Sequence, residues 1–126
     1  NFSSNKKYVF DNQQIISGTT DLKIEMPFQL KDITLDDCYS LTTNNLNFST
    51  PEYCFNIEST SKENFLQLYT PEVRNVIAIE PMTGAADNFN NKIGLQTLQP
   101  NETYNMKWLI AIDTINSKKH TNQLIK

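Results

Sequence analysis

The chain has 126 residues, a formal net charge of -3 and a hydrophobic content of 38%. This length fits one domain with a single hydrophobic core, and the many aromatic side chains exclude a disordered chain. The slightly acidic balance provides no field that would hold a nucleic acid. No apolar run approaches the ~20 residues needed to span a bilayer, so we expect neither nucleic acid nor a membrane as a partner.

The two cysteines, Cys38 and Cys54, are too few for a disulfide scaffold and lack the C-x-x-C spacing of a metal or redox site. Each lies in an apolar, strand-like run, which favours two buried thiols that pack as small hydrophobic side chains. The first residues do not form a signal peptide. Together with the unpaired cysteines, this favours a cytoplasmic location.

The dominant pattern is a series of short runs rich in aromatic and β-branched residues, separated by Asn, Asp, Ser, Thr, Pro and Gly. It predicts an antiparallel all-β protein, and no stretch keeps a helical period over three turns. In chain order the predicted strands are Lys7–Phe10, Leu22–Glu25, Cys38–Thr43, Tyr53–Glu58, Asn64–Tyr69, Val76–Ile79, Gly94–Leu98 and Thr103–Asp113.

Three connecting segments are expected between or after these strands. Residues 44–51 are polar and predict a loop. Before the last strand, Pro100 presets φ for a turn and Asn101 tolerates a left-handed conformation, which predicts a tight hairpin. Residues 116–126, which include the single histidine His120, predict a frayed tail or a short terminal strand. The whole chain is interpreted as one domain or one piece of a larger domain.

The run from Phe65 to Tyr69 alternates in character. Successive side chains of a strand point to opposite faces, so Phe65, Gln67 and Tyr69 share one face. Leu66 and Leu68 take the other face. The pattern therefore places the polar Gln67 among aromatic side chains.

Glu80 follows an apolar strand directly and precedes Pro81 and a glycine-containing loop. A carboxylate at such a strand end, buried on one side, would have its pKa raised toward the range of a general base. The alternative is a solvated Glu that merely ends a strand. Periodicity alone does not predict an enzyme.

Three segments around Glu80 together resemble the aldose 1-epimerase (galactose mutarotase-like) family. They are Ile79-Glu80-Pro81-Met82-Thr83-Gly84, Ala86-Asp87-Asn88-Phe89-Asn90 and Gly94-Leu95-Gln96-Thr97-Leu98-Gln99-Pro100-Asn101-Glu102. In that family a buried strand ends in the catalytic Glu, a Pro-Asp-x-x-Asn-like loop follows, and a Leu-x-Pro-Gly-Glu turn leads into the final strand. The order and spacing of the parts match, and the resemblance runs from about Val9 to about Asp113.

The resemblance implies an antiparallel β-sandwich of the galactose mutarotase-like type and an isomerase that interconverts the α and β anomers of an aldohexose. By resemblance Glu80 is the base that takes the proton from the C1 hydroxyl. Asp36, in a segment similar to the family's Asp-containing strand start, and Gln67 bind the sugar hydroxyls. The reaction needs no metal or organic cofactor. Three aromatic residues are candidates for an apolar platform under the sugar ring or for plain core positions: Tyr69, Phe89 and Trp108.

The chain also departs from the family pattern. The family's acid is a His, assisted by a second His, on strands that precede the matched region, and His120 matches neither. The family's sandwich is roughly twice as long, near the upper range for one all-β domain. We therefore expect the C-terminal half of such a sandwich, with an N-terminal half as its partner that carries the acid. Asn101 stands where the family's turn has Gly, a mild change because Asn tolerates positive φ.

Two other functions remain open at the level of sequence. A non-catalytic carbohydrate-binding module could use the same carboxylates only to hold hydroxyls, and the missing histidines favour it. A hexose-phosphate mutarotase would need a basic cluster for the phosphate. Arg74 is the sole arginine.

Overall fold

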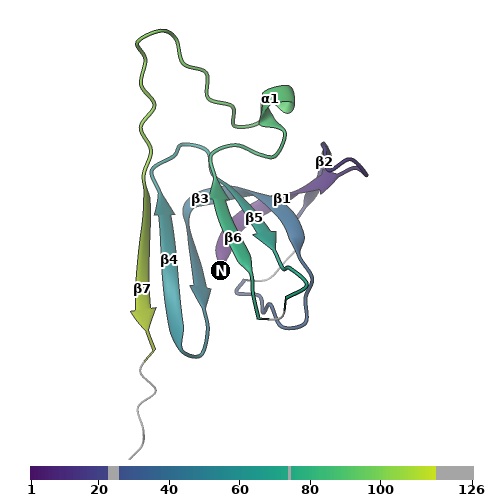
Figure 1. The fold of residues 1–126 in the computed structure, drawn as a ribbon, viewed down its shortest axis with the longest axis vertical. Helices are drawn as coiled ribbons and strands as arrows, with labels where there is room; N and C mark the ends of the chain where they lie inside the picture. The colour runs from purple at the N-terminus through teal and green to yellow at the C-terminus, as the bar shows by residue number, and fades with distance from the viewer. Residues whose placement is uncertain (23–25, 74, 116–126) are drawn as a thin grey trace, which may run out of the picture.

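The computed structural model of the protein describes residues 1–22, 26–73 and 75–115. It is mostly antiparallel β-structure, which confirms the all-β prediction, with one helix of four residues (Figure 1). No helix in these ranges is long and apolar enough to cross a membrane. The elements are β1 (Phe2–Phe10), β2 (Ile16–Asp21), β3 (Asp36–Ser49), β4 (Tyr53–Ser59), β5 (Phe65–Tyr69), β6 (Ala78–Met82), α1 (Asn88–Asn91) and β7 (Trp108–Thr114).

The strands form one hydrogen-bonded sheet around the long central strand β3. β1 pairs with one edge of β3, and β2 pairs with β1. The other edge of β3 forks, because residues 36–40 pair with β5 whereas residues 45–49 pair with β4. β6 follows β5 on one arm of the fork, and β7 follows β4 on the other.

Two hydrophobic clusters fill the space between the strands. The first contains buried residues from both arms, among them Ile57 of β4 and Leu66 of β5, so it ties the arms of the fork together. The buried residues of the first cluster are Phe2, Leu35, Tyr39, Leu46, Ile57, Leu66 and Leu68. The second cluster consists of Tyr8, Cys38, Phe65 and Ala85.

β5 is confirmed as an alternating strand. Leu66 and Leu68 belong to the first core cluster, whereas Phe65 belongs to the second, on the face that also carries Gln67. Both faces of β5 are therefore covered at this end. The cover over Phe65 includes Ala85 and the partly buried Ile93, because the chain after β6 folds back onto the sheet.

Several predicted strands agree with the structure, since β1, β3, β4, β5 and β6 contain or overlap the expected ranges. The prediction for Leu22–Glu25 falls mostly outside the described residues. Leu22 itself lies just after β2, a strand that the sequence pattern did not predict. Polar side chains dominate β2 and hid its strand character.

Four local predictions are wrong. The expected loop at 44–51 belongs largely to β3, which continues to Ser49 because it pairs with β4 there. The strand expected at 94–98 is absent, and the last strand begins at Trp108 rather than at Thr103. In Figure 1 residues 92–107 run as a long irregular connection from α1 to β7, so the predicted hairpin is also wrong.

The turn within that connection is confirmed. Asn101 has a φ of 72°, and the backbone N–H of Glu102 donates to the carbonyl of Gln99 at 3.0 Å. The side chain of Glu102 accepts a hydrogen bond from the backbone N–H of Gln99 at 2.8 Å. Asn supports the left-handed position that the turn requires.

Candidate functional site

Asp36, Gln67 and Glu80, here called the polar cluster, come from three neighbouring strands. Gln67 of β5 lies directly opposite Cys38 of β3 on one side and opposite Glu80 of β6 on the other. Residues directly opposite each other in an antiparallel pair share a face of the sheet. Asp36, two residues before Cys38, lies on this same face. The fold therefore brings together the three site residues expected from the sequence.

A direct hydrogen bond joins two members of the polar cluster. Gln67 Nε2 donates to Asp36 Oδ1 at 2.8 Å, although the two residues are 31 positions apart in sequence. Asp36 is exposed and Gln67 is half-buried, so the pair is accessible from solvent. The pair presents one amide and one carboxylate that can bind the hydroxyls of a polar ligand.

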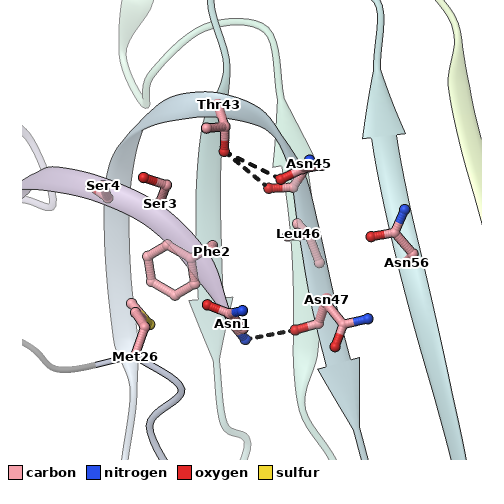
Figure 2. Close-up of a pocket in the computed structure, with 10 residues that line it drawn as sticks. All are labelled: Asn1, Phe2, Ser3, Ser4, Met26, Thr43, Asn45, Leu46, Asn47 and Asn56. Atoms are coloured by element: carbon pink, nitrogen blue, oxygen red, sulfur yellow. Dashed lines mark hydrogen bonds between the residues drawn. The ribbon is translucent and has the colours of Figure 1, made fainter.

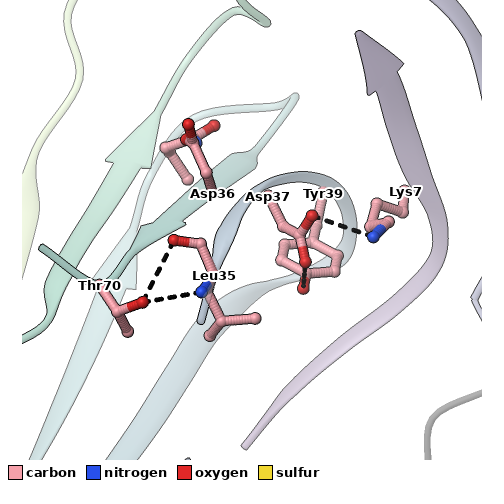
Figure 3. A network of polar contacts seen from close by, with 7 residues as sticks. Lys7, Leu35, Asp36, Asp37, Tyr39 and Thr70 are labelled. Carbon is pink, nitrogen blue, oxygen red and sulfur yellow. Dashed lines mark hydrogen bonds and ion pairs between the residues drawn. The ribbon is translucent and has the colours of Figure 1, made fainter. Parts of the chain in front are cut away.

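Two sets of contacts fix the backbone on either side of Asp36 (Figure 3). Before it, Leu35 N donates to Thr70 Oγ1 at 2.7 Å, and Thr70 N donates to the Leu35 carbonyl at 2.9 Å. After it, the carboxylate of Asp37 accepts from Lys7 Nζ at 2.9 Å and from the hydroxyl of Tyr39 at 3.1 Å. These contacts orient Asp36 through its neighbours, and none of them was predicted from the sequence.

Tyr39 forms the buried part of this support, and Asp37 is half-buried. Tyr39 is fully buried, and its pKa is raised by loss of solvent and by the adjacent Asp37 carboxylate. The neutral phenol therefore persists and keeps its proton available for Asp37. The Lys7–Asp37 ion pair is partly exposed, so it contributes mainly geometry and little stability.

Cys38 lies beside Gln67, on the face of the polar cluster, as a buried free thiol. It is fully buried, and burial raises the pKa of its thiol to about 11, against a partial opposing effect of the backbone of Ala86. The thiol is therefore a neutral packing group at physiological pH, as the sequence predicted. Cys54 on β4 is also free but only half-buried.

Glu80 stands on a sheet edge. Among the described strands, its strand β6 pairs only with β5, and the following Pro81 lacks an N–H, which suits an edge position. The Glu80 side chain is exposed, and the described residues provide it with no hydrogen-bond or ion-pair partner. The one-sided burial expected from the sequence is therefore not observed, and the alternative of a solvated Glu at a strand end describes the surroundings of this carboxylate.

The three aromatic candidates separate in space. Tyr69 lies directly opposite Asp36 and two residues after Gln67, on the face of the polar cluster, with 42% of its surface exposed. Phe89 belongs to α1 and is 79% exposed. Trp108 begins β7, on the other arm of the fork, opposite Ser59. Only Tyr69 is positioned by the sheet next to the polar cluster.

An open hollow of about 380 Å³ extends the face next to Asp36. Tyr8 and Phe10 of β1 contribute aromatic surface to it, and Gln14 contributes an amide. A larger hollow of about 490 Å³ lies elsewhere, around the start of β1 (Figure 2), and is lined by Asn1, Phe2, Ser3, Ser4, Met26, Thr43, Asn45, Leu46, Asn47 and Asn56. Because it contains no member of the polar cluster, we assign it no part in the site.

Some residues considered from the sequence cannot be placed. His120, Arg74 and the predicted tail at 116–126 lie outside the residues that the structure describes. Within the described ranges no group of three His, Cys, Asp or Glu side chains is arranged to hold a metal ion.

Comparison of the chain with protein-family models, with curated protein sequences and with solved structures gives no match. The case for a function therefore depends on the geometry of the polar cluster and on the sequence motifs around it.

Proposed function

We propose that this chain is part of an aldose 1-epimerase that interconverts the α and β anomers of an aldohexose. The observation that carries the proposal is the arrangement of the polar cluster. Gln67 donates to Asp36 at 2.8 Å and lies opposite Glu80 on the adjacent strand. Residues that are far apart in sequence, and that the motif resemblance independently selects, meet on one face of the sheet.

In the proposed mechanism Glu80 removes the proton from the C1 hydroxyl of the sugar. Its exposed carboxylate on a sheet edge is accessible to a ring lying on this face. Asp36 and Gln67 orient the sugar by hydrogen bonds, and Tyr69 offers apolar surface to one face of the ring. Protonation of the ring oxygen completes ring opening. We propose that the acid is a histidine on an N-terminal half of the same sandwich.

The proposed fold is part of a galactose mutarotase-like β-sandwich. The forked sheet and the first core cluster, which contains Ile57 of one arm and Leu66 of the other, support a layered arrangement.

The decisive experiment is Glu80→Gln in the full-length protein, with mutarotation of freshly dissolved α-D-glucose and α-D-galactose followed by polarimetry. Loss of a general base lowers the rate by roughly 10²- to 10⁴-fold. Glu52→Gln is the matched control, because Glu52 is exposed in the turn between β3 and β4 and loses the same charge. Unchanged catalysis by Glu80→Gln would exclude the proposed mechanism.

A non-catalytic carbohydrate-binding module is the second candidate. It is favoured by the absence of any histidine among the described residues, since a lone base cannot complete the reaction. Titration calorimetry with the same sugars separates the two functions. Binding that Glu80→Gln weakens, without any rate enhancement in the parent protein, would identify a binding module.

A further inference from the structure

β7 is an edge strand without the features that usually protect an edge. Of the three strands that end the described sheet, β2 is polar and contains Gly18, and β6 contains Glu80 and Pro81. β7 is apolar from Trp108 to Ile112, and Ile110 and Ile112 are 58% and 68% exposed. A long apolar edge with unpaired backbone groups is a template for another strand.

The backbone of β7 fixes which groups face the free edge. Lys107 exchanges hydrogen bonds with Thr60, and Ile115 N donates to the carbonyl of Glu52, so these odd-numbered residues point toward the β4 side. In an antiparallel ladder the side toward which a residue's backbone N–H and C=O groups point alternates from one residue to the next. The N–H and C=O groups of the even-numbered residues, with Ile110 at the centre, therefore point outward.

A second copy of β7 complements this edge in one register. If Ile110 lies opposite Ile110 of the other copy, Lys107 of each strand lies opposite Asp113 of the other, and Trp108 lies opposite Ile112. Leu109 then lies opposite Ala111. The Lys107–Asp113 pairs thus place opposite charges together at both ends of an otherwise apolar pairing. A shift of the centre to Ala111 would place Asp113 opposite Leu109 and lose the direct charge pairs.

We infer that two copies of this protein associate through antiparallel pairing of their β7 strands about a two-fold axis at Ile110. The outward N–H and C=O groups of Ile110, Trp108 and Ile112 form the new ladder. The two sheets become continuous, and Ile110 lies beside Ile57 of its own β4 and Ile110 of the second copy. The inference is independent of the proposed function, because β7 carries no member of the polar cluster.

Charge reversal tests the register in the full-length protein. Asp113→Lys and Lys107→Asp each replace two opposite-charge pairs with two like-charge pairs, and we expect each to weaken self-association roughly tenfold. The combined variant restores opposite charges and restores association. Asp21→Lys on β2 is the control for a charge change on another edge. Sedimentation equilibrium measures the mass, and failure of the combined variant to recover association would overturn the register.

Amide hydrogen exchange separates loss of strand pairing from loss of folding, because the inward amides of β7 report folding in the same variant. In the parent protein the outward amides of Trp108, Ile110 and Ile112 are protected together with the inward amides of Leu109 and Ala111. In either single variant only the outward amides lose protection. A monomeric mass for the parent protein overturns the inference, and a monomer with protected outward amides identifies a strand from a longer form of the chain as the occupant of the edge instead.

Discussion

Gln67 Nε2 donates a hydrogen bond of 2.8 Å to Asp36 Oδ1, while the same residue lies opposite Glu80 across the β5–β6 pair. Gln67 is thereby hydrogen-bonded to one carboxylate of the polar cluster and lies opposite the residue that carries the other. If all three residues bind one sugar, removal of the amide must affect both the orientation of Asp36 and the hydroxyl contacts of Gln67 itself.

The first prediction concerns Gln67→Leu. A hydrogen bond to a charged group contributes about 1.5–3 kcal/mol. Because Asp36 is exposed and water competes for it, we expect a contribution near the lower end of this range. We expect sugar affinity or kcat/KM to fall roughly tenfold, measured by calorimetry and polarimetry, with the unfolding midpoint nearly unchanged. Gln13→Leu, at an exposed turn, is the control. An unaltered sugar response would remove Gln67 from the site.

The second prediction concerns Thr70→Val, which keeps the side-chain shape and removes the hydroxyl. Thr70 Oγ1 accepts from Leu35 N at 2.7 Å, directly before Asp36. Loss of this acceptor leaves the amide unsatisfied, and we expect the free energy of unfolding to fall by about 1–3 kcal/mol in urea titrations. Thr19→Val on the exposed strand β2 should change it by less than about 0.5 kcal/mol. Equal effects of the two variants would contradict the assigned support of Asp36.

The strand content could be predicted from the sequence wherever apolar and aromatic residues are concentrated, as in β4 and β5. It could not be predicted for β2, whose Thr and Ser residues form a strand because β1 provides a partner ladder. The same holds for 44–49, where pairing with β4 overrides a polar composition. Conversely, 94–98 has strand-like side chains but no partner strand in the described structure.

The candidate site was selected from the sequence by motif resemblance, and the strand pattern added the position of Glu80 at a strand end and the face of Gln67. Its supports could not be predicted, because Lys7 reaches Asp37 and Thr70 reaches Leu35 through the registers of β1 and β5 on β3. Such registers depend on contacts between residues 30 or more positions apart, on which local patterns carry no information.

The third prediction concerns the pH dependence of stability. Burial raises the pKa of Cys38 from 9.0 to about 11, so between these values the folded thiol stays protonated whereas the unfolded thiol ionises. Unfolding then releases a proton, and the free energy of unfolding falls as pH rises, by at most about 1.4 kcal/mol per pH unit for this group. Cys38→Ala should make the fall shallower in urea titrations from pH 8 to 10.5. Some decrease of the free energy of unfolding with pH should remain in Cys38→Ala, because the pKa of the buried Tyr39 is also raised.

Cys54→Ala is the control for this slope, because Cys54 is half-buried on β4. In the parent protein a maleimide reagent should label Cys54 well before Cys38 at neutral pH, with the sites read by mass spectrometry. Labelling of Cys38 at the rate of Cys54 would show that the cover over Cys38, on the face of the polar cluster, opens to solvent.

The fourth prediction concerns the loop that covers the second core cluster. Gly94 has a φ of +72°, and a Cβ added there would lie 2.6 Å from Phe65 Cε2 and 2.7 Å from Gly84 Cα. Gly94→Ala therefore combines backbone strain with a clash against the main chain, and we expect the free energy of unfolding to fall by about 2–4 kcal/mol. Gly18→Ala in β2 meets nothing within 4 Å and should be neutral or slightly stabilising. Because the loop packs on Phe65, two residues before Gln67, Gly94→Ala should also increase maleimide labelling of Cys38. Equal stability of the two alanine variants would show that residues 83–94 do not pack on the sheet as described.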